Sequence, residues 1–338
     1  MKFTRLNNTI LNKGFFRFIA PGSKSVTNRA LIMLGLNENK AALENILIAE
    51  DTLVMINALY DLGAELIFDC KVNILTKTGI CQPRNRNVYL GYAGTAYRFL
   101  LPYLLTMRGK FKMYGEEELH KRPITELISC MKNLVDGMVY EDTGNRSIYC
   151  EINKLKNISS VSVDPVKSSQ FLTALLLVIP VIYDKFTIEC TNKPVSSTYI
   201  DLTMDMLKKT GINIEQENYS AYKIFGKQKY NFLKYNIEGD YSAASYFFAL
   251  SAISGIRSEI LNLDCLSKQG DKKFIEILER MGCVVNYKNS CNSIEILPPE
   301  KLRSAGEIDM SKMQDVVPTA AVAAVFAEGE TKIVNIEN

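Results

Sequence analysis

The chain has 338 residues, of which 47% are hydrophobic and 23% are charged, and its formal net charge at pH 7 is +3. This composition is typical of a globular protein, and the length favours two domains over one. Because the net charge is small and no long run of Lys and Arg is present, a dedicated nucleic-acid surface is excluded, and any anion binding must be local.

The N-terminal segment, MKFTRLNNTILNKGFF, lacks the continuous apolar core of a secretory signal. The longest apolar stretch, 171–183, is too short to span a bilayer, so we expect a cytoplasmic protein without membrane contact. The eight cysteines include no CxxC pair and the chain has a single histidine, which makes a structural zinc site improbable. We expect the cysteines to be reduced, partly buried thiols.

Five apolar, alanine-rich segments, each after a small or polar turn, predict buried helices. In chain order they are GSKSVTNRALIMLGL, AGTAYRFLLPYLL, SSQFLTALLLVI, YSAASYFFALSAI and MQDVVPTAAVAAVFA. With Lys24, Thr95, Ser169, Ser242 and Asp315 as markers, they recur at intervals of 71, 74, 73 and 73 residues. The period is too long for a solenoid repeat and predicts a small α/β unit that is built repeatedly.

A second series has the same period and predicts an amphipathic helix, a glycine at the left-handed C′ position, and a strand. Its segments are INALYDLGAELIF, LISCMKNLVDGMVY, LTMDMLKKTGINI and FIEILERMGCVVNY, with glycines at 63, 137, 211 and 282. Further strands such as KFTIEC and SIEILP lie between the helices. Four units are complete, and a fifth stops at Asn338 after its first helix and strand.

Several of the predicted helix starts are suited to anions, because unpaired backbone N–H groups and the helix dipole meet there. Three such starts lie in the first half of the chain, at 21–25, 94–95 and 168–170, and the nearby cations are Lys24, Arg29, Arg98 and Arg122. If the repeats bring them together, they form a pocket for phosphate or carboxylate. Simple N-capping is an equal alternative for any single start. The segment GSKS does not have the spacing of a phosphate-binding P-loop.

His120 follows the acidic run Glu116–Glu118 and precedes Lys121 and Arg122 in a predicted loop. No serine, cysteine or metal-ligand cluster is evident to pair with it. We predict a solvated histidine without a catalytic role.

Eight motifs in order resemble the EPSP synthase (3-phosphoshikimate 1-carboxyvinyltransferase) family over the whole chain. They are PGSKSVTNRAL, GYAGTAYRFL, KRPITEL, SSQFLTALL, VSSTYIDLTMDMLK, EGDYSAASYFFA, KQGDKKFIEILERMG and DMSKMQDVVPTAAVAAVFAEGETKIVNIEN. The motifs PGSKS…NRA and SSQFLTALL are specific to that family.

The resemblance implies a two-domain, inside-out α/β barrel fold of repeated βαβαββ units with buried parallel helices, and an active site in the cleft between the domains. It places residues 22–238 in one three-unit domain. Residues 1–21 and 239–338 form the second domain, which lacks its last unit. The family needs no metal or cofactor, and we expect a monomer whose partners are small-molecule substrates.

The resemblance also implies roles for individual residues. Lys24 is expected to donate a proton and Asp315 to accept one. Residues matching the family's shikimate 3-phosphate ligands are Lys24, Ser25, Arg29, Ser168, Ser169, Gln170, Ser196, Tyr199, Asp315 and Asn338. Those matching its phosphoenolpyruvate ligands are Lys24, Gly94, Arg122 and Gln170.

Two departures from the family pattern are present. Tyr92 replaces the usual Asn before Ala-Gly-Thr, and the family's Lys-Glu-x-Asp-Arg motif, Asp-His-Arg motif and late lysine, which follow Asn338, do not occur. We therefore expect shikimate 3-phosphate binding without meaningful turnover by these 338 residues. The alternatives are the related transferase acting on UDP-N-acetylglucosamine and a non-catalytic remnant that binds shikimate 3-phosphate or serves as a scaffold. The UDP-sugar alternative is disfavoured because no cysteine lies in the expected catalytic loop.

Overall fold

The computed structural model describes residues 14–144, 146–194, 196–288, 290 and 292–336. The chain divides into two compact units. Unit 1 comprises residues 1–23 and 238–338, and unit 2 comprises residues 24–237. Within the described ranges, no helix is both long and apolar enough to cross a membrane.

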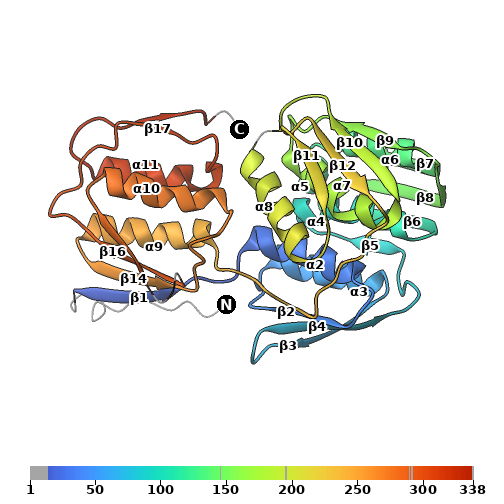
Figure 1. Cartoon of the computed structure of the whole chain (residues 1–338), viewed down its shortest axis with the longest axis horizontal. Helices are drawn as coiled ribbons and strands as arrows, with labels where there is room; N and C mark the ends of the chain where they lie inside the picture. Colours follow the sequence, from blue (N-terminus) through green and yellow to red (C-terminus); the bar gives the residue numbers. More distant parts are fainter. Residues whose placement is uncertain (1–13, 145, 195, 289, 291, 337–338) are drawn as a thin grey trace. The chain divides into compact units, whose positions relative to one another are not determined.

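Unit 2 contains three four-stranded sheets (Figure 1). The first has the order β13 (Lys234–Asn236), β2 (Ala41–Glu44), β4 (Ile74–Ile80), β3 (Ala64–Asp69). The second has the order β5 (Asn87–Tyr89), β6 (Gly109–Tyr114), β8 (Ser147–Leu155), β7 (Val135–Asp142). The third has the order β9 (Ser160–Val163), β10 (Lys185–Cys190), β12 (Ala221–Phe225), β11 (Ile214–Glu217).

Unit 1 contains one four-stranded sheet and one parallel pair. The sheet has the order β1 (Phe15–Ile19), β14 (Arg257–Leu261), β16 (Ser293–Leu297), β15 (Val284–Lys288). The pair is β17 (Glu307–Asp309) with β18 (Lys332–Val334). In all four large sheets the first two strands are parallel and the next two pairings are antiparallel. This shared topology confirms the repeated α/β unit, in separate sheets rather than a closed barrel.

The chain passes between the units at Ser23/Lys24 and Ile237/Glu238. As a result, the first strand β1 pairs with β14 (Figure 1), whereas β13 pairs with β2. Gly22 and Gly239 form an isolated antiparallel bridge in unit 1. A Cβ atom at position 239 would lie 1.9 Å from the Asn262 carbonyl oxygen, so only glycine fits this close approach.

The helices follow the two predicted series. The first series is α2 (Lys24–Leu36), α4 (Gly94–Tyr103), α7 (Ser169–Ile182), α9 (Tyr241–Ser254) and α11 (Val317–Val325). The second is α3 (Glu50–Asp61), α6 (Thr125–Leu134), α8 (Ser197–Lys209) and α10 (Phe274–Arg280). The short pieces are α5 (Glu117–His120), η1 (Leu104–Thr106), η2 (Gly270–Lys273) and η4 (Gln314–Val316). In unit 2, α2, α4 and α7 pack on one another and supply most of the apolar core.

Three of the four periodic glycines occupy the predicted C′ position. Gly63, Gly211 and Gly282 follow their helices with φ of +106°, +90° and +103°. The prediction is wrong for Gly137, which lies inside β7 at a register shift with φ +155°. Because α6 continues directly into β7, no C′ residue is needed there; a Cβ atom at position 137 would instead collide with the Glu151 carbonyl oxygen at 1.8 Å.

The cysteine prediction is wrong in one case. Cys265 is disulfide-bonded. The free thiols are those of Cys70, Cys81, Cys130, Cys150, Cys190 and Cys283. Spacing along the sequence does not show which sulfur atoms approach each other in space, and composition alone therefore missed this bond.

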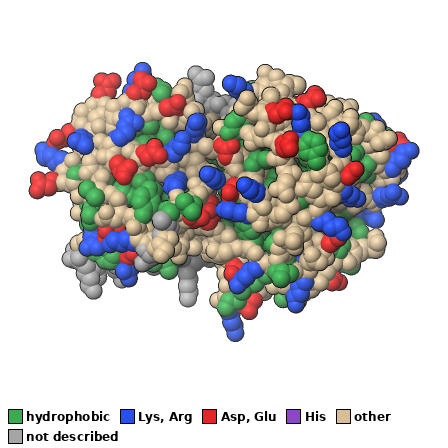
Figure 2. Space-filling model, in the orientation of Figure 1, with side chains coloured by type: hydrophobic (Ala, Val, Ile, Leu, Met, Phe, Trp, Pro, Cys, Tyr) green, Lys and Arg blue, Asp and Glu red, His purple; other side chains and the backbone are tan. Residues whose placement is uncertain are grey.

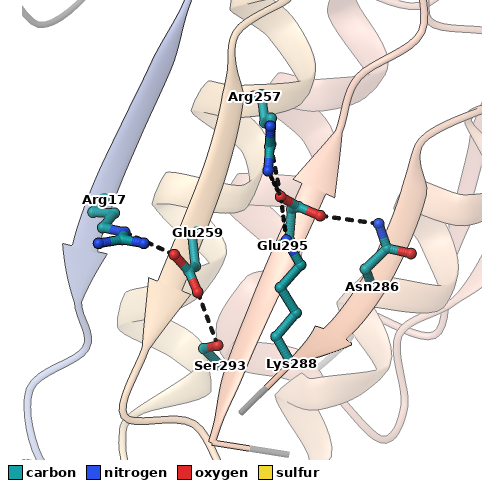
Figure 3. Close-up of polar contacts among 7 residues, drawn as sticks. All are labelled: Arg17, Arg257, Glu259, Asn286, Lys288, Ser293 and Glu295. Carbon is teal, nitrogen blue, oxygen red and sulfur yellow. Dashed lines mark hydrogen bonds and ion pairs between the residues drawn. The ribbon is translucent and has the colours of Figure 1, made fainter.

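One face of the unit 1 sheet carries two buried glutamates directly opposite each other (Figure 3). Glu259 accepts hydrogen bonds from Arg17 at 2.7 Å and from Ser293 at 3.2 Å. Glu295 accepts from Arg257 at 2.6 Å and from Asn286 at 3.0 Å, and pairs with Lys288 at 2.7 Å. Like charges facing each other across strands repel, so these partners are what make the arrangement stable.

Candidate anion-binding site at the helix starts of unit 2

Arg29 lies in the second turn of α2, and the residue is only 3% exposed. Its Nε donates to Thr203 Oγ1 at 2.8 Å, and its terminal nitrogens donate to the carbonyl oxygens of Ser25 at 2.8 Å and Tyr199 at 3.1 Å. These acceptors are all neutral, and no carboxylate in the described part of the chain pairs with Arg29. Burial lowers the pKa of Arg29 to about 10, although the Tyr199 side chain opposes this. A buried cation in a neutral cage favours an incoming anion.

These contacts join the first two turns of α2 to the first two turns of α8. Thr203 Oγ1 also donates to the Tyr199 carbonyl oxygen at 2.7 Å, and the Arg29 guanidinium lies 5.7 Å from the Tyr199 ring and 5.6 Å from the Phe99 ring. Ser196, the residue before α8, has φ +57°, a left-handed conformation that costs a serine free energy. Such strain is common at ligand-binding positions, and it marks this helix start as a candidate.

A second group joins the starts of α4 and α7. Ser168 caps α7 by accepting the Gln170 backbone N–H at 3.2 Å. The Gln170 side chain then reaches α4: its Nε2 donates to Thr95 Oγ1 at 3.4 Å, and its Oε1 accepts from Arg98 at 2.8 Å. Ser169, the first residue of α7, is buried. Ser168 does cap α7, but capping does not account for Arg98, which is buried beside it.

Two arginines lie close to the start of α4. Arg98 donates twice to the Pro123 carbonyl oxygen, at 3.2 and 2.9 Å. Burial, together with the nearby charge of Arg122, lowers the pKa of Arg98 to about 10. The Arg122 stem crosses over Gly94, where an added Cβ atom would lie 2.7 Å from Arg122 Cδ. The two positive charges repel each other, so an anion at this helix start would relieve the repulsion.

Lys24 begins α2 and forms an ion pair with Asp51 of α3. The side chain of Lys24 remains half-exposed, which leaves it accessible to a ligand. Basic and acidic side chains are interspersed on the face shown in Figure 2, so no broad basic surface is visible there. The positive charge relevant to an anion is concentrated at the helix starts of unit 2.

The predicted residues fall into three groups. Ten of them lie in unit 2, at the starts of α2, α4, α7 and α8 and in the turn after α5: Lys24, Ser25, Arg29, Gly94, Arg122, Ser168, Ser169, Gln170, Ser196 and Tyr199. Within this set, Arg29 contacts Ser25 and Tyr199, Arg122 lies against Gly94, and Gln170 contacts Ser168. Asp315 is an exposed residue of η4 in unit 1. Asn338 lies outside the described residues.

Sequence reasoning did not identify Thr203, Phe99 or Pro123, which hold the arginines in place. Thr203 follows Tyr199 by one helical turn, and this spacing was an available signal. The interpretation of His120 as a solvated loop residue is wrong. It ends α5, and its side chain is 9% exposed against Tyr97 because α5 packs its apolar Leu119 inward.

The sequence profile of EPSP synthase (3-phosphoshikimate 1-carboxyvinyltransferase) matches residues 17–338. The chain belongs to the EPSP synthase family. It is 36% identical over 323 residues to the 3-phosphoshikimate 1-carboxyvinyltransferase of Colwellia psychrerythraea, covering 94% of this chain and 75% of that protein. It is 35% identical over 327 residues to the Buchnera aphidicola protein of the same name, covering 94% and 74%.

A solved structure of EPSP synthase from Acinetobacter baumannii superposes with a TM-score of 0.77 at 22% identity, covering 94% of this chain and 73% of that one. At 22% identity, this structural similarity shows that the two chains share a fold. This family member thus spans about three quarters of the length of the relatives that it matches. The predicted family and the repeated α/β fold are both confirmed.

Proposed function

We propose that the reaction of this protein is transfer of the enolpyruvyl group of phosphoenolpyruvate to the 5-hydroxyl of shikimate 3-phosphate, giving EPSP and phosphate, as a step of aromatic amino acid biosynthesis. These 338 residues are expected to bind shikimate 3-phosphate without meaningful turnover. The observation that carries the proposal is the buried Arg29 guanidinium, which has only neutral partners in the described structure. Membership of the EPSP synthase family supports the same reaction.

Shikimate 3-phosphate is proposed to bind at the starts of α2, α7 and α8. Its phosphate would accept hydrogen bonds from Ser169 and the neighbouring helix-start N–H groups, with Arg29 supplying the charge. Lys24, Ser25, Ser168, Ser196 and Tyr199 complete this proposed subsite, and Asp315 of unit 1 is proposed to contact the shikimate hydroxyl. Gln170 lies between the two proposed subsites because it contacts both Ser168 and Arg98.

Phosphoenolpyruvate is proposed to bind at the start of α4. Arg122 lies against Gly94, whose backbone N–H is one of the unpaired donors of the helix start. Lys24 and the amide of Gln170 complete this subsite. Two cations and a helix dipole suit the carboxylate and phosphate of this substrate.

The chemistry is an addition followed by an elimination. Asp315 accepts the proton of the 5-hydroxyl as its oxygen bonds to C2 of phosphoenolpyruvate, and Lys24 supplies the proton that adds to C3. The tetrahedral intermediate then returns a proton from C3 to the Lys24 amine and expels phosphate, which restores the double bond. The cations at the helix starts stabilise the departing phosphate.

The test is calorimetric titration of the purified chain with shikimate 3-phosphate, alongside phosphate release in the presence of phosphoenolpyruvate. Shikimate 3-phosphate should bind, and phosphate release at ordinary enzyme rates would refute the expected lack of turnover. The variant Arg29→Met is expected to weaken shikimate 3-phosphate binding by about 100-fold, or about 2.8 kcal/mol. Arg29→Lys should recover part of this loss, and Arg84→Met, at an exposed arginine of the same unit, serves as the control.

Ser169→Ala combined with Arg29→Ala should weaken binding well beyond any loss of folding stability, because capping is done by Ser168 rather than Ser169. Equal losses of binding and of stability would assign these residues to capping and packing alone. Tight binding of UDP-N-acetylglucosamine in place of shikimate 3-phosphate would overturn the proposed substrate.

A further inference from the structure

The turn that carries Arg122 is held on α4 at three points. The Arg122 stem lies on Gly94, the Pro123 carbonyl oxygen accepts two hydrogen bonds from Arg98, and His120 packs on Tyr97. The Arg122 backbone N–H donates to the Leu119 carbonyl oxygen at 3.2 Å, which continues α5 into the turn. The place of the Arg122 guanidinium therefore depends on how α5 docks on α4.

Of these three contacts, the one made by His120 has no role in the proposed reaction. Its Nδ1 lies 3.4 Å from the Tyr97 hydroxyl, and the two rings meet edge to face with their centroids 5.6 Å apart. Its Nε2 is buried and has no hydrogen-bond partner in the described structure. An unsatisfied buried polar atom costs about 1–3 kcal/mol, so a purely apolar ring would dock here at lower cost.

The groups facing the His120 ring set its charge. Glu141 of β7 lies 4.0 Å from Nδ1, Tyr97 faces it from α4, and Arg146 follows β7. Arg146 pairs with Glu117 on the same short helix at 3.2 Å, and Lys121 also pairs with Glu117, at 3.6 Å. Burial and the charge of Arg146 lower the pKa of His120, and burial raises the pKa of Glu141. The ring is therefore neutral near pH 7.

We propose that His120 is a positioning residue for Arg122: its neutral ring docks α5 on Tyr97 and so places the guanidinium at the start of α4, and its protonation undocks the turn. The ligand assigned to Arg122 rests on the proposed function, whereas the docking does not. Glu141 would face Nδ1 of an imidazolium, but burial raises the pKa of this carboxyl and so favours its neutral form. The other N–H would be buried without a partner in the described structure, close to the charge of Arg146, which favours release of the turn in mild acid.

The structural test needs no ligand. Amide hydrogen exchange of residues 119–123 is compared in the wild type, His120→Ala, His120→Phe and Tyr97→Phe, with α2 as an internal reference. His120→Ala should speed exchange in this segment at least tenfold, whereas His120→Phe keeps a ring in place and should stay within threefold. Tyr97→Phe should fall between them because it removes only the hydroxyl. After correction for intrinsic exchange, these amides should exchange faster at pH 5 than at pH 7 in the wild type but not in His120→Phe.

The functional test measures the Kd of phosphoenolpyruvate in the presence of saturating shikimate 3-phosphate. His120→Ala should raise the Kd of phosphoenolpyruvate at least tenfold and leave the Kd of shikimate 3-phosphate within twofold of the wild-type value. His120→Phe should keep both Kd values close to those of the wild type. Unchanged exchange in His120→Ala would overturn the proposal, as would faster exchange with unchanged phosphoenolpyruvate affinity. If the wild type binds no phosphoenolpyruvate while the exchange pattern is as expected, the docking role stands and the ligand proposed for Arg122 is wrong.

Discussion

The Arg98 guanidinium donates to the side-chain oxygen of Gln170 over 2.8 Å and so ties the second turn of α4 to the first turn of α7. The residues are 72 positions apart, about one repeat. The hydrogen bond leaves the positive charge of Arg98 uncompensated, because the amide oxygen is neutral. This hydrogen bond, the Arg98–Gln170 tie, thus holds the two helix starts together and leaves the positive charge of Arg98 available to an anion.

Replacing Gln170 separates these two effects. Gln170→Glu should keep the tie, now as an ion pair, and hold the thermal unfolding midpoint at or above that of the wild type. It should nevertheless weaken phosphoenolpyruvate binding at least tenfold, since the new carboxylate neutralises Arg98. Gln170→Leu should lower the midpoint by breaking the tie. Undiminished phosphoenolpyruvate affinity in Gln170→Glu would contradict a role for this positive charge.

Asp271 is expected to make the stability of unit 1 depend on pH. Burial raises the pKa of its carboxyl to about 7; the Ser242 hydrogen bond opposes this rise, and the charges of Asp315 and Asp240 add to it. The folded state therefore holds this proton to a higher pH than the unfolded state does. The contribution of Asp271 to the free energy of unfolding should be constant below about pH 4 and fall, on the order of 4 kcal/mol in total, as the pH rises to 7.

Asp271→Asn keeps the size of the side chain without its titration, so this part of the pH dependence should disappear. Urea unfolding monitored by hydrogen exchange in residues 274–280, at pH 5 and pH 7.5, measures the difference between the two proteins. Equal differences between wild type and variant at the two pH values would show that Asp271 titrates normally.

Glu295 is expected to give the opposite pH dependence in the same unit. Burial raises the pKa of its carboxyl, but hydrogen bonds from Lys288, Asn286 and Arg257 outweigh it and bring the pKa down to about 2 (Figure 3). The stability that this carboxylate contributes should be complete above about pH 4.5 and should be lost as the pH falls towards 2. Glu295→Gln should cost about 2–3 kcal/mol at pH 7, because it leaves Arg257 and Lys288 facing a neutral group.

The matched control is Glu307→Gln, since the Glu307–Lys332 pair in the same unit is exposed on both sides. Exposed pairs contribute little, and this variant should change the free energy of unfolding by less than about 1 kcal/mol. Comparable losses in the two variants would mean that burial does not strengthen the Glu295 network.

The sequence predicted those features that depend on local patterns. The starts of α2, α4 and α7 followed from small residues ahead of apolar helices, and Gly63, Gly211 and Gly282 marked helix ends. It could not predict contacts between residues that are distant in the sequence and close in the folded chain. His120 and Tyr97 are 23 residues apart, and Arg29 and Thr203 are 174 apart, so neither contact leaves a periodic signal. For the same reason the disulfide of Cys265 and the strand bulge at Gly137 were missed.

Lys77 is the remaining buried cation for which the structure makes a sharp prediction. Its ammonium group caps the end of α2 by donating to the carbonyl oxygens of Gly35, at 3.2 Å, and Asn37. Burial lowers its pKa to about 8, although the charge of Glu38 opposes the shift. The unfolded chain therefore binds this proton more tightly than the folded chain, and the stability of unit 2 should rise between pH 8 and about 10.

Lys77→Met should abolish that rise, because the variant has no proton to lose. It should also leave two carbonyl oxygens without their donor, a cost of about 1–3 kcal/mol that does not vary with pH. The measurement is the free energy of unfolding of both proteins at pH 7.5 and 9.5, monitored by hydrogen exchange in residues 24–36. Subtracting the value for Lys77→Met from that for the wild type at each pH removes the contribution of the other titrating groups. If this difference is the same at both pH values, the ammonium titrates as it does in water.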